Sequence, residues 1–278
     1  MKLPILFVVM LIFQQALLAQ IAEYKMADTL YISHDGMNPA PGQISKNNKN
    51  FYFTMENENT AEEFIYVMKR KKAGKPFSAP EKIKGVVNEN PTPAQPSLTE
   101  DELAMVYVKV SNNTWTDNDI YIAYREKKSA EFSEFRTLSE MNSPDEADAY
   151  PYISPDGLNI YYVKGDYLYH SSRFDMGVKF SQASKVYFGD YGSYADYSGI
   201  YGAWLSPDQL QIYFVYSSAI YAADRAYPDT EWSEPYVYCY PRTEDAFISG
   251  VSFSSDMKEM FLYVSYDDKD LVCSFKKQ

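Results

Sequence analysis

One pattern, repeated five times, constrains the fold of this 278-residue chain more than any other feature. A Ser or Thr opens a turn, an Asp or Asn follows two positions later, and an aromatic and aliphatic run comes next. The clearest copies are ISPDGLNIYY, from Ile153, and LSPDQLQIYF, from Leu205. The openers lie 54, 55, 52 and 48 residues apart, so the repeating unit has about 50 residues. The openers are Ser45, Thr99, Ser154, Ser206 and Ser254.

The side chains of the repeat explain its turn. Ser at the first position bonds back to the backbone, Pro presets φ at the second, Asp or Asn suits the third, and Gly suits the fourth. Apolar runs on both sides make each copy a β-hairpin. Asp156, whose place is taken by Asp or Asn in every copy, is therefore predicted to form a turn rather than to catalyse a reaction.

A second signal follows each of the first four turns. It consists of a β-rich triplet, a basic residue, a polar loop, and an aromatic residue followed by Ser. Four short strands in a unit of about 50 residues are typical of a propeller blade. The basic residues are Arg70, Arg125, Arg173 and Arg225, and the aromatic residues are Phe77, Phe132, Phe180 and Trp232.

The last copy is truncated, and the N-terminal residues supply what it lacks. After Asp270 only LVCSFKKQ remains, which is enough for a third strand and no fourth. We expect the strand from Thr29 to Ser33 to pair into the last blade, because an open ring would leave unpaired strand edges. The sequence therefore predicts an all-β fold, a single five-bladed β-propeller of four-stranded blades that covers residues 20–278.

The SPDG turns, the strand that follows them and the I-Y-x triplet resemble the WD40-like repeat called PD40, found in TolB-like propellers. The resemblance covers the whole predicted propeller. It is strongest in the third and fourth copies and weakest in the first, where Asn47 and Asn48 replace Asp and Gly. It implies an exported protein that binds partner proteins through one face and, in many members, has no enzymatic activity.

The N-terminus, MKLPILFVVMLIFQQALLAQ, has the features of a secretory signal peptide over residues 1–19. Its apolar run is short for a membrane span, so an uncleaved anchor is the less favoured alternative. We therefore expect an exported protein, either periplasmic or secreted, with no membrane span. The two cysteines, Cys239 and Cys273, lie in strand-like runs, and buried free thiols are favoured over a disulfide.

The net charge of −12 disfavours nucleic acid and anionic lipid as partners. Acidic residues concentrate in the between-blade loops and the second-to-third-strand turns, which share one face of a propeller. Arg70, Arg125 and Arg173 are expected on the opposite face. Two interpretations of the acidic face stay open: a solvated surface that maintains solubility, or a site at the mouth of the central channel.

An unusual loop, GDYGSYADYSGIYGAW at residues 189–204, adds tyrosines to this face. Such side chains offer rigid apolar surface and a hydroxyl, as in many binding sites, although several could instead fill the channel or a blade seam. The candidate ligand-binding residues are Tyr191, Tyr194, Tyr197, Tyr201, Trp204, Asp148, Asp196, Glu244, Asp245 and His34.

The sequence thus predicts a non-catalytic, monomeric propeller that binds an envelope or extracellular protein, or a glycan, through its acidic, tyrosine-bearing face. The alternative is a secreted carbohydrate-active enzyme, similar to glycoside hydrolases, that uses a pair of carboxylates such as Asp148 with Asp196 or Glu244. No cofactor is expected. Ca²⁺ is the one cation that the acidic loops could hold, without a recognisable loop motif.

Overall fold

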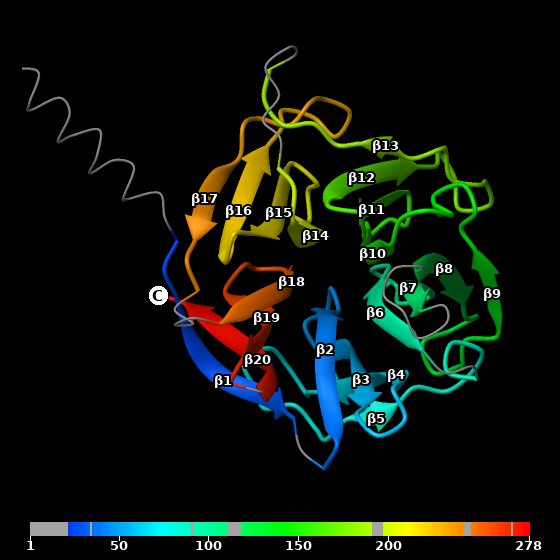
Figure 1. Cartoon of the computed structure of the whole chain (residues 1–278), viewed down its shortest axis with the longest axis vertical. Coiled ribbons are helices and arrows are strands. Elements are labelled where there is room, and N and C mark those ends of the chain that lie inside the picture. The colour runs from blue at the N-terminus through cyan, green and yellow to red at the C-terminus, as the bar shows by residue number, and fades with distance from the viewer. Residues whose placement is uncertain are drawn as a thin grey trace, which may run out of the picture.

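The computed structural model describes residues 22–33, 35–89, 92–110, 118–190, 197–241, 246–267 and 269–278. The predicted signal peptide, residues 1–19, lies outside these ranges. Figure 1 shows five sheets arranged in a ring around a central axis. Each sheet contains four antiparallel strands in the described residues, so the predicted all-β, five-bladed propeller is confirmed.

The strands of the first three blades follow one another in chain order from the axis outward. Blade 1 contains β2 (Met37–Ile44), β3 (Asn50–Asn57), β4 (Glu62–Lys69) and β5 (Glu81–Lys82). Blade 2 contains β6 (Pro93–Leu98), β7 (Ala104–Val110), β8 (Asn118–Tyr124) and β9 (Glu134–Thr137). Blade 3 contains β10 (Asp148–Ile153), β11 (Asn159–Lys164), β12 (Tyr167–Ser172) and β13 (Ser184–Lys185).

Blade 4 keeps this strand order, whereas blade 5 takes its outermost strand from the N-terminus. Blade 4 contains β14 (Ile200–Leu205), β15 (Gln211–Tyr216), β16 (Ala219–Asp224) and β17 (Tyr236–Cys239). Blade 5 contains β18 (Phe247–Phe253), β19 (Glu259–Tyr266) and β20 (Lys269–Lys277), and its outermost strand is β1 (Tyr24–Ile32) from the other end of the chain.

The pairing of β1 with β20 closes the ring, as predicted. Thr29 lies opposite Cys273 and Tyr31 lies opposite Val272. The strand begins at Tyr24, five residues earlier than the sequence suggested. Both cysteines are buried and free, and burial raises the pKa of Cys239 to about 12 and that of Cys273 to about 11. They are structural thiols with little thiolate character.

The repeated turn has the same hydrogen bonds in all five blades. The opener's hydroxyl donates to the side chain two residues later, as from Ser154 to Asp156 at 2.5 Å, and accepts from the amide five residues later. The fourth residue always has a positive φ, 74° at Gly157 and 57° at Glu102, for example. The predicted turn-forming role of Asp156 is therefore confirmed.

The repeated basic residue holds the blade together. In blade 3, Nε of Arg173 donates to the carbonyl of Gly157, and its guanidinium lies 4.3 Å from the ring centre of Phe180. The arginines of the other three copies bond to the turn and stack on their aromatic partners in the same way. Arg70 and Arg173 are buried, so the prediction that they belong to a basic surface was wrong.

These arginines also reach the preceding blade. Nη2 of Arg70, in blade 1, donates to Glu259 of blade 5 at 2.6 Å, and both side chains are buried. In blade 4, Nη1 of Arg225 donates to the Tyr161 hydroxyl of blade 3 at 3.4 Å. The arginines therefore link neighbouring blades as well as the strands within one blade.

Blade 5 has no arginine at this place, and the N-terminal strand supplies a substitute. The hydroxyl of Tyr24 donates to the carbonyl of Met257 at 2.7 Å, the equivalent of the turn carbonyls that the arginines contact. It also lies 3.3 Å from the Tyr238 hydroxyl of blade 4. Thus β1 completes both the hydrogen-bonded edge of the last blade and its link to the blade before.

We expect Arg70→Ala to lower the free energy of unfolding by about 3 to 5 kcal/mol, because it leaves the Glu259 carboxylate buried without its partner. Lys258→Ala, next to that carboxylate in sequence but exposed, should change it by less than about 0.5 kcal/mol. Urea unfolding followed by tryptophan fluorescence measures both. Equal losses in the two variants would contradict the assigned role of Arg70.

Candidate functional site

The central channel is built from the same irregularity in every inner strand. Each of β2, β6, β10, β14 and β18 has a shift of register, a β-bulge, that includes the residue four positions before the turn opener. Bulges bend a strand and redirect its side chains. Four of the five residues at this position have a positive φ. The five residues are Pro41, Gln95, Tyr150, Gly202 and Gly250.

Glycine is required where the bulges meet across the axis. A Cβ added to Gly250 would lie 2.4 Å from Cβ of Pro41, and one added to Gly202 would lie 3.2 Å from Cα of Gly250. The channel that remains between the bulges has a volume of about 40 Å³. Because a buried water needs roughly 10 to 15 Å³ on this measure, the space suits a few water molecules and no larger ligand.

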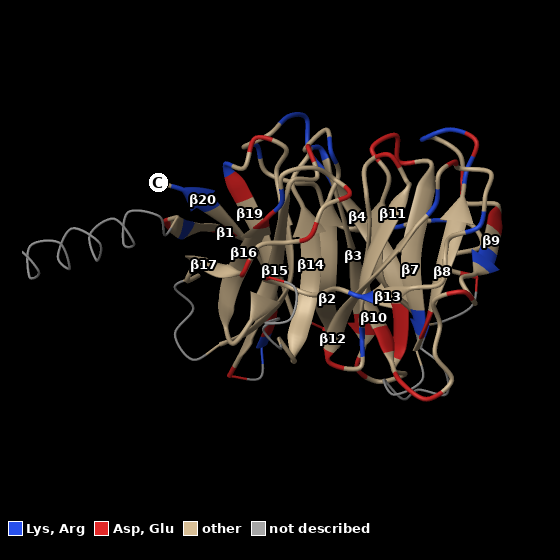
Figure 2. Ribbon diagram, turned by 90° about the horizontal axis from the view of Figure 1, so that it is seen from above, with Lys and Arg blue, Asp and Glu red and all other residues tan. Residues whose placement is uncertain are grey.

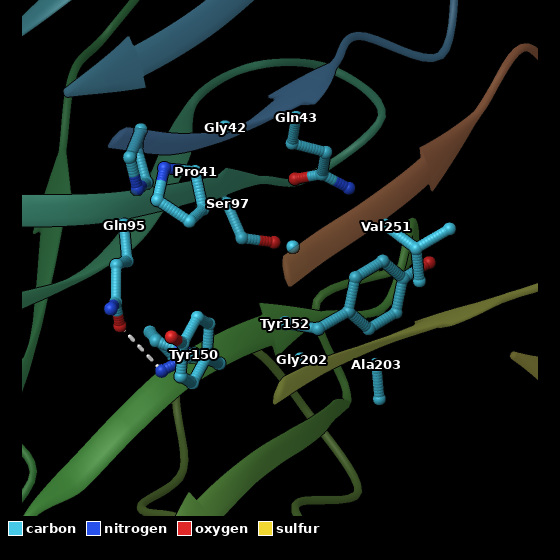
Figure 3. A pocket seen from close by; sticks show the side chains of 13 residues that line it. Pro41, Gly42, Gln43, Gln95, Ser97, Tyr150, Tyr152, Gly202, Ala203 and Val251 are labelled. Atoms are coloured by element: carbon cyan, nitrogen blue, oxygen red, sulfur yellow. Dashed lines mark hydrogen bonds between the residues drawn. The ribbon is translucent and has the colours of Figure 1, made fainter. Parts of the chain in front are cut away.

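Side chains of one blade satisfy the inner edge of the next. The Leu98 amide donates to Oε1 of Gln43 at 3.0 Å, and the Ile153 amide donates to Oγ of Ser97 at 3.0 Å. The Tyr150 amide donates to Oε1 of Gln95, as Figure 3 shows by a dashed line. These bonds use the polar groups that line the channel for structure.

An aromatic strip lies on the face where the inner strands begin. The rings of Tyr150 and Tyr201 are 6.3 Å apart, those of Tyr201 and Phe247 are 5.0 Å apart, and those of Phe247 and Tyr263 are 6.5 Å apart. Tyr201 is 38% exposed and Phe247 is 43% exposed. We call these four residues the aromatic strip. It joins blades 3, 4 and 5, and Tyr150 also lines the channel (Figure 3).

The structure separates the predicted tyrosines. Tyr201 belongs to the aromatic strip, whereas Tyr197 packs against Phe214 and Tyr216 on blade 4, with ring centres 5.9 and 5.1 Å away. Trp204 is only 5% exposed, in the core against Phe253. The remaining candidates except Asp148 lie outside the described residues: Tyr191, Tyr194, Asp196, Glu244, Asp245 and His34.

Sequence reasoning missed Tyr150, Phe247 and Tyr263. Tyr150 and Tyr201 begin neighbouring inner strands but stand at different distances from their turn openers, and Phe247 is further still from its own. The repeat alignment therefore did not match them. An aromatic residue near the start of three successive inner strands was the available signal.

Asp148, the remaining candidate, is fully buried at the start of β10. Its Oδ2 accepts from the Ser143 amide at 2.6 Å, while its Oδ1 has no hydrogen-bond partner among the described residues. Burial raises the pKa of Asp148 to about 7, although the Ser143 bond and Lys164 lower it in part. The carboxyl group thus braces the loop before β10.

The face that carries the aromatic strip is also acidic. In Figure 2, Asp and Glu colour most of the charged positions along the lower edge, whereas the upper edge, which carries the repeated turns, mixes both charges. Burial and, to a smaller extent, the neighbouring Glu56 raise the pKa of Glu63 to about 8. Burial, Asp270 and Glu58 also raise the pKa of Glu56.

The described ranges contain no group of three or more His, Cys, Asp or Glu side chains placed to hold a metal ion. Nowhere in those ranges does a helix have both the length and the hydrophobicity to cross a bilayer. Neither finding bears on the residues outside the described ranges.

No family model matches the chain, and no curated protein matches it, so membership of the PD40 family stays a prediction. Among solved structures, the GH43_1 enzyme from Xanthomonas citri is similar with a TM-score of 0.62 and 11% identity, over 94% of this chain and 92% of that one. The periplasmic gluconolactonase PpgL from Pseudomonas aeruginosa has a TM-score of 0.50 and 11% identity, over 86% and 68%.

TolB from Acinetobacter baumannii is similar with a TM-score of 0.46 and 16% identity, over 84% of this chain and 54% of that chain. The chain therefore spans about half the length of that TolB structure and 37% of the length of a puromycin hydrolase that it also matches. At such identities the likeness of the two better-fitting structures shows a shared propeller fold, and activity must be argued from the site.

The raised pKa of Asp148 gives stability a specific pH dependence. Its pKa is about 7 in the folded protein and about 3.9 in an unfolded chain. Between these values the folded state holds a proton that the unfolded state has released, so the free energy of unfolding falls as pH rises from about 4 to about 7. Asp148→Asn should remove on the order of 4 kcal/mol of this decline.

Urea unfolding at half-unit pH steps measures the effect. Asp166→Asn, at an exposed position near the same edge, is the control and should keep the wild-type slope. Because Glu63 also has a raised pKa, Asp148→Asn should keep a decline in stability with pH that is smaller than that of the wild type. An unchanged slope in Asp148→Asn would contradict a protonated Asp148.

Proposed function

We propose that this chain is an exported, non-catalytic propeller that binds a partner protein or a glycan on the face where its inner strands begin. The observation that carries the proposal is the aromatic strip, whose exposed members, Tyr201 and Phe247, pack edge to face at 5.0 Å. Aromatic rings fixed by their neighbours offer a ligand apolar surface at small entropic cost.

The surroundings of the strip favour binding of an extended ligand over capture of a small one. The channel beneath it has a volume of only about 40 Å³, because the bulged backbone of the inner strands fills most of the space around the axis. Acidic side chains flank the strip, and the Tyr263 hydroxyl donates to Asp270 at 2.6 Å. A ligand would therefore lie across the rim, with apolar or sugar-ring faces on the aromatic side chains and donors toward the carboxylates.

The lining of the channel supports binding rather than hydrolysis. Glycoside hydrolysis requires two carboxyl groups across the scissile bond. The thirteen residues that line the channel are Gly, Pro, Gln, Ser, Tyr, Ala and Val. Asp148, which the enzymatic alternative would use, is buried with a raised pKa and is bonded to backbone. The likeness to a GH43_1 enzyme is a likeness of fold.

The test compares aromatic variants on the two faces. Biotinylated protein is applied to a glycan microarray and to solubilised envelope proteins of the native host, and the ligand so identified is titrated. The double variant Tyr201→Ala and Phe247→Ala should weaken that binding by about tenfold or more, as for residues at the centre of an interface. Tyr227→Ala, 67% exposed in the loop after β16, is the control and should bind like the wild type.

Two results would contradict the proposal. One is equal affinity of the double variant and the wild type for the identified ligand. The other is release of shortened products from a bound glycan, because that would make the protein a hydrolase.

A further inference from the structure

Two glutamates face each other on blade 1, at the face that carries the aromatic strip. Glu56 on β3 lies directly opposite Glu63 on β4 in the register of the two strands, so both side chains leave the same side of the sheet. Like charges at opposite positions destabilise a sheet. Among the described strand pairs, this is the one place where two acidic residues lie opposite each other. The corresponding hairpin of blade 2 pairs Lys109 with Asp119, whose charges attract.

Glu63 has no partner in the described part of the chain. Its side chain is buried, with the residue only 4% exposed, and it forms no hydrogen bond or ion pair with a described residue. Its carboxyl oxygens lack a partner without being fully buried, so the small exposed area of the residue includes them. The strand of blade 2 that packs against β3 and β4 is β6, which has no charged residue, and β5 pairs with the far part of β4, at Tyr66 and Val67. No described cation therefore neutralises this carboxyl group when it ionises.

Other carboxylates add to the cost of ionising this pair. Glu56 itself has a raised pKa, because of burial and the nearby charges of Asp270 and Glu58. Asp270 belongs to blade 5, next to blade 1 in the ring (Figure 1), and accepts a hydrogen bond from the Tyr263 hydroxyl of the aromatic strip at 2.6 Å. Glu56 and Glu63, here called the carboxyl pair, thus lie beside one end of the aromatic strip.

The surroundings of the carboxyl pair indicate which cation it suits. Ca²⁺ takes about six to eight oxygen ligands, whereas the described residues contain no group of three or more His, Cys, Asp or Glu placed to hold a metal ion. An ammonium group is strongly hydrated, so it would lose much solvation beside a carboxyl group as enclosed as that of Glu63. A guanidinium group is more weakly hydrated, and its planar fork of N–H donors can bond to two carboxylates at once.

We propose that the carboxyl pair binds an arginine side chain of a partner protein whose apolar side chains lie on the aromatic strip. This inference rests on the proposed function, because it names the class and the charge of the ligand for the same face. As the guanidinium group arrives, Glu63 releases its proton to solvent, and the two carboxylates then accept the N–H groups of the arginine. Proteins break the rules of local stability where function requires it, and the bound arginine would remove the repulsion between the two glutamates.

The experiment titrates the full mature chain by calorimetry with acetylated tetra-arginine amide, at about 0.15 M salt to screen unspecific attraction. Two comparison probes are tetra-lysine amide, which has the same charge, and a glucosamine trimer, which carries ammonium groups on a glycan. The test variant is Glu56→Gln with Glu63→Gln. The charge-matched control is Glu58→Gln with Asp267→Asn, two exposed positions near the same edge. A urea midpoint no lower than that of the wild type confirms that each variant is folded.

We expect tetra-arginine to bind the wild type about tenfold more tightly at pH 9 than at pH 7, because Glu63, with a pKa of about 8, must ionise to form the ion pair. Guanidinium stays charged over this range. At pH 7 binding should release about one proton per peptide, seen as a dependence of the heat on the ionisation enthalpy of the buffer. The control should behave like the wild type. The test variant should lose the pH dependence and bind about tenfold or more weakly at pH 9.

The inference is overturned if tetra-arginine does not bind at millimolar concentration, or if tetra-lysine or the glucosamine trimer binds as tightly. It is also overturned if the test variant keeps the affinity and the pH dependence of the wild type. The variant Tyr201→Ala with Phe247→Ala retains both carboxyl groups and should bind tetra-arginine like the wild type. Failure at the carboxyl pair is therefore distinguishable from failure at the aromatic strip.

Discussion

The antiparallel pairing of β1 with β20 is the interaction on which the rest of the structure depends. It supplies the outermost strand of blade 5 and removes the exposed edge that β20 would otherwise present. It also brings Tyr24 to a turn carbonyl whose equivalent is contacted by an arginine in each of the other four blades. Once the ring is closed, blade 5 is fixed against blade 1, where Gly250 approaches Pro41 and Arg70 bonds to Glu259.

Closure in turn decides where the protein can bind other molecules. Five bulged inner strands meet so closely that the channel is almost filled, and the side chains of one blade satisfy the backbone of the next. A ligand therefore has the rims available to it. One rim carries the aromatic strip, whose rings come from three different blades. Such differences between copies of one repeat are where function is expected, because the shared residues are used for folding.

The sequence predicted the features that depend on local chemistry. The turn geometry, the count of blades and the supply of the last strand follow from Ser154, Asp156 and their equivalents and from the length of the final copy. Arg70 and Arg173 were misassigned to the surface because a basic residue beside a polar loop reads as exposed, and nothing local shows that its guanidinium stacks on an aromatic ring and bonds to a turn.

The candidate site was harder to predict because bulges break the alternation of inward and outward side chains. Tyr201 and Ala203 are two residues apart in β14, where a regular strand would place them on the same face, yet Ala203 is buried and Tyr201 reaches the rim. The partners of Tyr201 come from blades 3 and 5, so the strip exists only after the ring has formed.

A disulfide trap at the closing strands tests this account most directly. Thr29 lies opposite Cys273 in the register of β1 and β20, and opposite residues in such a pair are close enough for a bond after small adjustment. Thr29→Cys, oxidised under mild conditions, should form an intramolecular disulfide with Cys273, seen as one linked peptide by mass spectrometry, and should raise the urea midpoint. A linkage to Cys239 instead, or two thiols that stay free while the protein remains folded, would contradict closure of the ring by its N-terminal strand.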